Sequence, residues 1–205
     1  YLREHLFYTH RIHYVITEGG EAPNVVPDKA SVWYYVRNTD ERIEDTFKRV
    51  SDCARGAALA SGTELDTVII LTATHQKHVN KGLAETIQKN IELVGLPEWT
   101  ENENSFAKAL QKELGAKETG YPDKINPLRE PATIHVGGGS TDVGEVSLIA
   151  PTATLNFPGQ VPGGTGHHWS TVTAGYGSAA WKGLNAGAKV MAGTAIDLLT
   201  DQKLL

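Results

Sequence analysis

Two segments near the start of the chain decide its fold. Residues 11–18 read RIHYVITE and residues 31–37 read SVWYYVR. In the first segment, Ile12, Tyr14 and Ile16 alternate with less apolar neighbours, which is the period of a β-strand. The second segment is dense in β-branched and aromatic residues, which favour strands. Residues 21–28 between them are rich in turn-forming residues. We therefore predict an antiparallel hairpin with a long connection.

The residues after the hairpin predict a helix and a further strand. Apolar residues at helical spacing indicate a helix over about residues 41–60, with Asp40 as its N-cap and Gly62 at its end. Residues 66–72 read DTVIILT and predict a strand. Residues 1–6 have the pattern of the closing turns of a helix. This order matches a βαββαβ sandwich of the ferredoxin-like kind that lacks its first strand and most of its first helix.

The rest of the chain has a different, mixed pattern. Apolar residues at helical spacing predict helices over about residues 83–94, 105–114 and 171–199. Between the last two, short apolar runs such as residues 133–136 lead into glycine-rich loops, an α/β pattern in which ligands collect at loops beyond strand ends. Five glycines in the last predicted helix are expected to let that helix lie close to a sheet. The sequence thus predicts an α/β protein in two unlike parts.

Composition excludes several classes of protein. The chain has 205 residues, of which 40% are hydrophobic and 21% charged, as in soluble globular proteins. Its net charge of -5 and the lack of a Lys/Arg run argue against a nucleic-acid or acidic-membrane surface, and no apolar stretch is long enough to span a bilayer. Cys53 is the only cysteine, so we expect a small buried hydrophobe, no internal disulfide and a cytoplasmic setting. Because the first residue is Tyr1, we expect that the natural polypeptide begins further upstream.

Two glycine-dense loops are the candidate site. Residues 137–142 read GGGSTD and residues 162–169 read PGGTGHHW. Neither loop matches a P-loop or a Rossmann fingerprint. A backbone that can approach a ligand closely, with a carboxylate in one loop and adjacent imidazoles in the other, is typical of two walls of one active site. One of His167 and His168 is a candidate metal ligand, whereas Asp142 could orient an imidazole, hold substrate or cap the next turn. A catalytic metal needs about three protein ligands, so we expect the chain to be part of an enzyme.

Other candidate residues give weaker evidence of a functional site. His75 and His78 have metal-like spacing but lie in a polar link, so we expect surface histidines. No Gly-x-Ser-x-Gly elbow occurs and Cys53 lies inside a predicted helix, so a nucleophilic serine or cysteine enzyme is not supported.

Several segments together resemble a known family. They are RIHYVITEGG (residues 11–20), APNVVP (22–27), VWYYVR (32–37), GGSTDVGEVS (138–147) and TGHHWS (165–170). They are similar to the M20 metallopeptidase and amidohydrolase family, and within it to the aminobenzoyl-glutamate utilisation branch. The resemblance covers nearly the whole chain. It implies that the chain is only the C-terminal part of such a protein. Residues 1–76 would be a partial ferredoxin-like lid or dimerisation domain, and residues 77–205 the C-terminal part of a zinc-peptidase-like α/β catalytic domain.

The resemblance also implies an activity. Such enzymes hydrolyse an amide bond to an amino acid, typically in p-aminobenzoyl-glutamate, with two divalent metal ions, Mn or Zn, that activate a water. The general base and the other metal ligands are expected upstream of this chain, which alone should bind metal poorly and be inactive. Homodimers through the lid, and possibly a second hydrolase subunit, are the expected partners beside the small-molecule amide. The alternative is a non-catalytic dimerisation or folding module with an incomplete pocket.

The family's functional residues carry over to single positions. His167 falls where the family has its C-terminal metal-binding histidine, with His168 as the alternative. Asn24 and Arg37 match lid residues that contact the substrate's carboxylate or scissile carbonyl, although a turn-forming asparagine and a strand-end surface charge are the plainer explanations. The residues expected to line the pocket are Gly138, Thr141 and Asp142.

Overall fold

The computed structural model describes residues 1–130, 139–157 and 159–201. They form two compact units, Tyr1–Lys77 with Pro131–Ile149 and His78–Glu130 with Ala150–Leu205. The first holds η1 (Leu2–His5), β1 (Arg11–Glu18), β2 (Ser31–Arg37), α1 (Ile43–Ser61) and α4 (Val143–Ile149). The second holds α2 (Lys81–Val94), α3 (Glu101–Glu113), α5 (Trp169–Gly175) and α6 (Ser178–Thr200). This mixture of helices with a small sheet agrees with the predicted α/β class, whereas the predicted domain limits stay a prediction.

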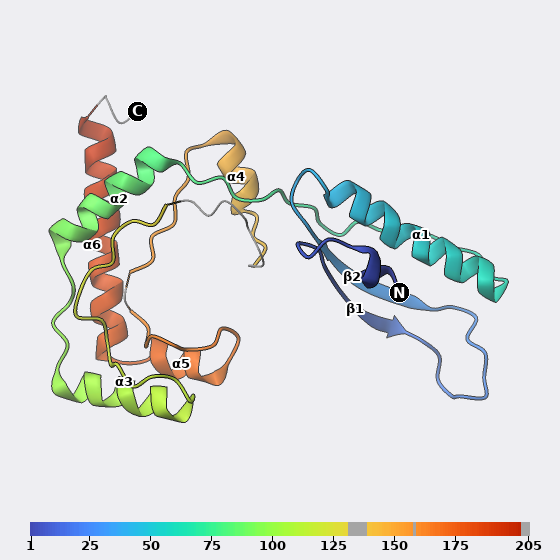
Figure 1. The fold of residues 1–205 in the computed structure, drawn as a ribbon, viewed down its shortest axis with the longest axis horizontal. Helices are drawn as coiled ribbons and strands as arrows, with labels where there is room; N and C mark the ends of the chain where they lie inside the picture. Colours follow the sequence, from blue (N-terminus) through green and yellow to red (C-terminus); the bar gives the residue numbers. More distant parts are fainter. Residues whose placement is uncertain (131–138, 158, 202–205) are drawn as a thin grey trace. The chain divides into compact units, whose positions relative to one another are not determined.

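The predicted hairpin is confirmed. β1 and β2 pair antiparallel, with Tyr14 opposite Tyr34 and Val15 opposite Trp33, and α1 lies beside them (Figure 1). The rings of Tyr14 and Tyr34 are 5.6 Å apart on one face, a cross-strand pair of the kind that stabilises sheets. This aromatic pair helps to hold the two strands in the observed register.

α1 confirms the predicted helix but not its predicted cap. It ends at Gly62, whose φ of 69° suits glycine. The backbone N–H groups of Arg42 and Ile43 both donate to Thr39 O, so a turn precedes the helix and Arg42 becomes the N-cap without a side-chain bond. Asp40 lies outside the helix, and its carboxylate accepts a hydrogen bond from the Gln76 N–H at 3.0 Å. The prediction that Asp40 caps α1 was wrong for this reason.

Two other expectations for the first unit were wrong. No backbone in the described residues pairs with residues 66–72, so this segment is not a strand. Its apolar side chains lie open, with Ile69 71% and Leu71 72% exposed. β-propensity favours an extended chain but cannot supply the partner that a ladder needs. Cys53, expected to be buried, is exposed on α1.

The second unit confirms two predicted helices. α2 covers the predicted 83–94, and the Asn80 side chain caps it by accepting from the Leu83 N–H at 2.9 Å. α3 begins four residues before the predicted 105, because Thr100 and Glu103 form a reciprocal capping box. A Thr-x-x-Glu pattern before a helical run is the signal that places this start correctly.

The long helix predicted over residues 171–199 is two helices. α5 ends at Gly175, and α6 begins after Gly177, whose φ of 143° is a conformation that side-chain-bearing residues rarely adopt. α6 crosses α2 (Figure 1), and in the described part of the chain no sheet lies against it. One of its glycines, Gly183, instead lies against a loop: a Cβ placed on Gly159 would meet the Cα of Gly183 at 3.6 Å.

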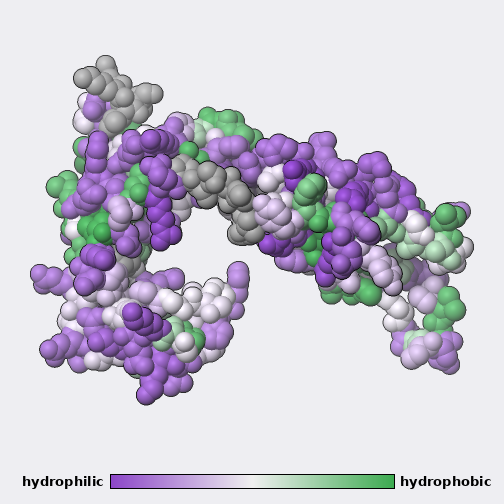
Figure 2. Space-filling model, viewed as in Figure 1, coloured by the Kyte–Doolittle hydropathy of each residue, from purple (hydrophilic) through white to green (hydrophobic). Residues whose placement is uncertain are grey.

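Figure 2 shows where apolar side chains remain on the surface. In this view, apolar side chains gather over α4 in the first unit and over α2 and α6 in the second unit. Ile149 at the end of α4 is 87% exposed, and Leu93 of α2 and Leu199 of α6 are 83% and 84% exposed.

We predict that Gly193→Ala destabilises the second unit. A Cβ at Gly193 would overlap the Asn90 Oδ1 atom. Asn90 is 4% exposed and donates to Asp197 Oδ2 at 2.6 Å and to Thr86 O at 3.1 Å, so it cannot turn away without losing these bonds. We expect a loss of about 1–3 kcal/mol in the free energy of unfolding, measured by urea denaturation, because overpacking outweighs alanine's helix propensity.

Gly187→Ala is the matched control on the same helix. A Cβ there would meet Leu155 Cδ2 at 3.8 Å and Phe157 Cβ at 4.0 Å, which are ordinary contacts. We expect this variant to be unchanged or stabilised by up to about 1 kcal/mol. Equal destabilisation by both substitutions would refute the close α2–α6 packing at Gly193.

Candidate functional site

The second glycine loop is held against the start of α5. Val161, which precedes it, is 5% exposed. Thr171 of α5 donates its hydroxyl to Thr165 O at 2.9 Å, which folds the loop back onto the helix. Gly163 takes a φ of 80° that glycine adopts readily. The loop therefore presents His167 from a fixed backbone.

The structure separates the roles of the two adjacent histidines. His168 is the N-cap of α5: its Nδ1 accepts from the Ser170 N–H at 3.4 Å and lies 2.9 Å from Ser170 Oγ. His167 has a φ of 57°, is exposed, and its ring makes no hydrogen bond with any residue that the structure describes. His168 is thus engaged in capping, whereas both ring nitrogens of His167 are available. This geometry supports His167 over His168 as the candidate ligand.

A complete metal site is not formed by the described residues. No group of three or more His, Cys, Asp or Glu side chains gathers among residues 1–130, 139–157 and 159–201. Because a catalytic zinc takes about three protein ligands, the donors present here do not by themselves fit such an ion. The metal-ligand role of His167 therefore stays a prediction.

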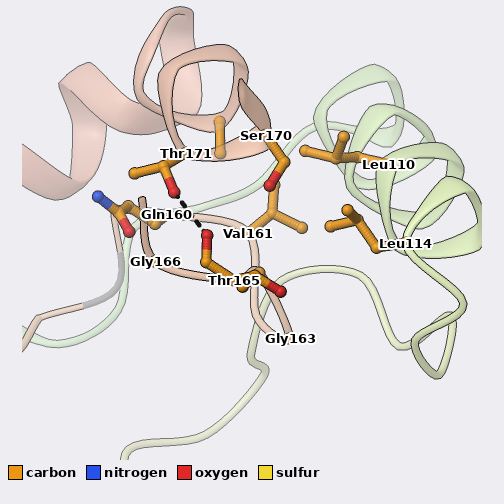
Figure 3. A pocket seen from close by; sticks show the side chains of 11 residues that line it. Leu110, Leu114, Gln160, Val161, Gly163, Thr165, Gly166, Ser170 and Thr171 are labelled. Atoms are coloured by element: carbon orange, nitrogen blue, oxygen red, sulfur yellow. Dashed lines mark hydrogen bonds between the residues drawn. The ribbon is translucent and has the colours of Figure 1, made fainter. Parts of the chain in front are cut away.

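A small hollow opens beside the same loop (Figure 3). Its volume is about 180 Å³. Leu110 of α3 and Leu114, the C-cap residue of that helix, form its apolar side, and the backbone of Gly163–Gly166 forms its rim. Three of its lining residues, Leu110, Val161 and Ala174, belong to a buried cluster that also holds Ala107, Tyr121 and Ala179. The hollow can accept a small apolar group, but neither His167 nor His168 lines it.

Thr141 and Asp142 lie in the first unit, at the start of α4. The Thr141 hydroxyl accepts from the Val143 N–H at 3.4 Å and faces Asp142 Oδ1 at 3.3 Å. The carbonyl of Asp142 accepts from the Glu145 N–H at 3.0 Å. Among the described residues, the side-chain hydrogen bond to the start of α4 is made by Thr141, and the exposed Asp142 carboxylate accepts the Thr141 hydroxyl. Gly138, also expected to line the pocket, lies outside the described residues.

The structure does not bring Asn24 and Arg37 together. Asn24 is exposed in the connection that precedes β2, and Arg37 is half-buried at the other end of β2, with its guanidinium 5.4 Å from the Tyr35 ring. β2 itself, at about 3.3 Å per residue, is roughly 20 Å long, and Arg37 lies at the end of β2 away from the connection that holds Asn24. His167 belongs to the second compact unit, whereas Asn24 and Arg37 belong to the first.

Sequence reasoning missed a buried carboxylate in the second unit. Glu103 is 8% exposed and accepts from Lys182 Nζ at 2.8 Å, from Ser178 Oγ at 2.5 Å and from the Thr100 N–H at 2.7 Å. Burial acts to raise its pKa, but the hydrogen bonds from Lys182, Ser178 and Thr100 outweigh burial and lower the pKa to about 2. The capping-box spacing was the available signal. Glu103 joins α3 to α6 and is structural.

The comparisons with known proteins bear on the class of protein. No protein-family model matches the chain. The chain is 32% identical to one of the subunits of the p-aminobenzoyl-glutamate hydrolase of Escherichia coli (strain K12), over all of this chain and 48% of that protein. It is 28% identical to the Xaa-Arg dipeptidase of Mus musculus, over all of this chain and 41% of that protein. The human Xaa-Arg dipeptidase gives a similar match.

These relatives are hydrolases of the M20 family. The chain is a homologue of these proteins along its whole length and matches a C-terminal part of them, so the resemblance seen in the sequence is confirmed. It spans less than half the length of each. Separately, none of the helices in the described residues is long and apolar enough to cross a membrane.

Proposed function

We propose that the protein is a metal-dependent amidohydrolase that cleaves an amide bond to an amino acid, in p-aminobenzoyl-glutamate or a related N-acyl amino acid. The observation that carries this proposal is the similarity of the whole chain to two hydrolases whose names both describe cleavage of such a bond. Similarity to two enzymes does not favour the alternative of a non-catalytic module.

The residues of this chain take distinct parts in the proposal. His167 supplies one imidazole ligand from its fixed loop, and Asp142 with Thr141 and Gly138 lines the pocket. Arg37 offers a bidentate fork to a substrate carboxylate, and Asn24 offers an amide to a carboxylate or carbonyl oxygen. When bound, two Mn or Zn ions polarise the scissile carbonyl and lower the pKa of a water.

The remaining parts of the proposal concern the whole protein. Residues 1–76 belong to a ferredoxin-like lid that mediates a homodimer, and residues 77–205 to a zinc-peptidase-like catalytic domain. The general base lies outside this chain, so the chain alone is inactive. A second hydrolase subunit is a candidate partner, because one relative is itself named as one subunit of a hydrolase. The cytoplasm is the proposed location, because a chain with a single cysteine forms no internal disulfide and suits a reducing compartment.

A substrate panel tests the proposal. The whole protein, supplied with Mn²⁺ or Zn²⁺, is offered p-aminobenzoyl-glutamate, a dipeptide ending in arginine, and p-aminobenzoyl-glutamate esterified at both carboxylates. We expect release of p-aminobenzoate from the first substrate, with a lower kcat/KM for the ester because Arg37 loses its anionic partner. Preference for the arginine dipeptide would replace the substrate assignment, and no hydrolysis of any amide would refute the function.

A further inference from the structure

The turn that carries Thr141 and Asp142 is fastened to a distant segment of the same unit. Glu145 lies in the first turn of α4, and His75 lies 70 residues earlier in the chain. One carboxylate oxygen, Glu145 Oε1, accepts the His75 backbone N–H at 2.7 Å and lies 2.9 Å from its Nδ1. Since Nδ1 faces a carboxylate, it carries a proton.

The close approach of Gly144, which precedes Glu145, to the backbone of His75 supports the same contact. A Cβ at Gly144 would overlap the carbonyl of His75, so α4 approaches His75 closely enough that only glycine fits. The backbone N–H of the next residue, Gln76, donates to the Asp40 carboxylate at 3.0 Å. His75 and Gln76 therefore form a fixed support under α4.

Two backbone hydrogen bonds connect the first turn of α4 to the candidate binding residues. The Gly144 N–H donates to Thr141 O at 3.3 Å, and the Glu145 N–H donates to Asp142 O at 3.0 Å. Any shift of Glu145 relative to His75 would therefore move Thr141 and Asp142 with it.

We propose that Glu145 is a positioning residue: by clamping His75 it fixes the turn that presents Thr141 and Asp142 to substrate. The inference rests on the proposed function for the role of Asp142, but the clamp itself does not. Its contacts lie at side chains that are 57% and 45% exposed, where solvent can weaken them. The side-chain part of the clamp is therefore weaker than a buried pair would be.

The charge state of His75 sets the strength of the clamp. The hydrogen bond and charge of Glu145, with a smaller effect of Asp40, raise the pKa of His75 above its ordinary value, and the bonds from His75 lower the pKa of Glu145. Among the described residues, the charged groups that act on the pKa of His75 are Glu145 and Asp40, and Lys77 and His78 follow two and three residues later in the chain. A raised histidine pKa means that the added stabilisation is complete below the ordinary value and is lost as pH rises through the folded-state pKa.

Two measurements test the clamp, with the variants Glu145→Ala and Glu145→Gln, and Glu64→Ala as an exposed-carboxylate control. Histidine-ring NMR of the whole protein, assigned with His75→Gln, follows the titration of His75, and ¹⁵N-threonine labelling follows the Thr141 amide. We expect the Thr141 amide to titrate with His75 in the wild type and in Glu64→Ala. In Glu145→Ala we expect the pKa of His75 to fall and the Thr141 amide to lose this titration.

In the hydrolysis assay we expect Glu145→Ala to raise KM by about tenfold, with a smaller change in kcat. Glu145→Gln keeps the acceptor oxygen and should recover part of the loss. An active wild type with an unchanged KM in Glu145→Ala would overturn the positioning role. If the wild type hydrolyses no amide, the proposed function fails, and the NMR titration alone decides the clamp: a Thr141 amide that ignores His75 overturns it.

Discussion

His167→Ala in the whole protein is expected to lower kcat/KM for the amide substrate by about a thousandfold or more, because a metal supplies several kcal/mol of transition-state stabilisation. The reason lies in the loop geometry: His167 is exposed, and its ring makes no hydrogen bond with any described residue. We expect the loss mainly in kcat, measured at saturating substrate, together with weaker metal binding.

The controls separate this chemistry from local folding. His167 adopts a φ of 57°, which histidine and asparagine tolerate better than alanine. His167→Asn therefore keeps the backbone while removing the imidazole, and should be as inactive as His167→Ala. His168→Ala removes the N-cap of α5 and should cost about 1 kcal/mol of stability with activity largely kept. Activity retained in His167→Asn but lost in His168→Ala would reverse the assignment.

The largest expected effect on stability comes from Glu103→Ala. This substitution removes the acceptor of Lys182, Ser178 and the Thr100 N–H at once, and so uncouples α3 from α6. We expect a loss of about 2–4 kcal/mol in the free energy of unfolding, measured in urea at neutral pH. Glu101→Ala is the control: Glu101 is an exposed acid in the first turn of the same helix and should cost less than about 1 kcal/mol.

The effect of Glu103 should also depend on pH. Its folded-state pKa of about 2 lies below the ordinary value of 4.5. A carboxyl with a depressed pKa contributes stability that is complete above its ordinary pKa and is lost as pH falls towards the folded-state value. The stability difference between wild type and Glu103→Ala should therefore shrink from pH 5 to pH 2. A difference that stays constant over this range is incompatible with an ionised Glu103 held by these bonds.

Local patterns predicted the elements whose contacts lie close in sequence. The hairpin, α1 and α2 each carry a periodic apolar face with turn or glycine ends, and these signals belong to the segment itself. The predicted strand at residues 66–72 failed because a strand also needs a partner. The break before α6 depends on the backbone of Gly177, which the apolar stripe does not reveal.

The candidate site could be predicted only in part. The two glycine loops and the adjacent histidines were visible as composition, but the choice between His167 and His168 depends on which ring caps α5. Asn24 lies in the connection before β2 and Arg37 at the far end of β2, and the resemblance alone does not indicate this separation. The contact of His75 with Glu145 joins residues 70 positions apart, so no local spacing indicates it.

The most direct test of the account is the metal content of the whole protein, purified after loading with Mn²⁺ or Zn²⁺. We predict about two ions per chain in the wild type and in His168→Ala, and loss of at least one ion in His167→Asn, whose backbone is preserved. Wild-type metal content and rate in His167→Asn would contradict the claim that this loop supplies a ligand to the hydrolytic centre.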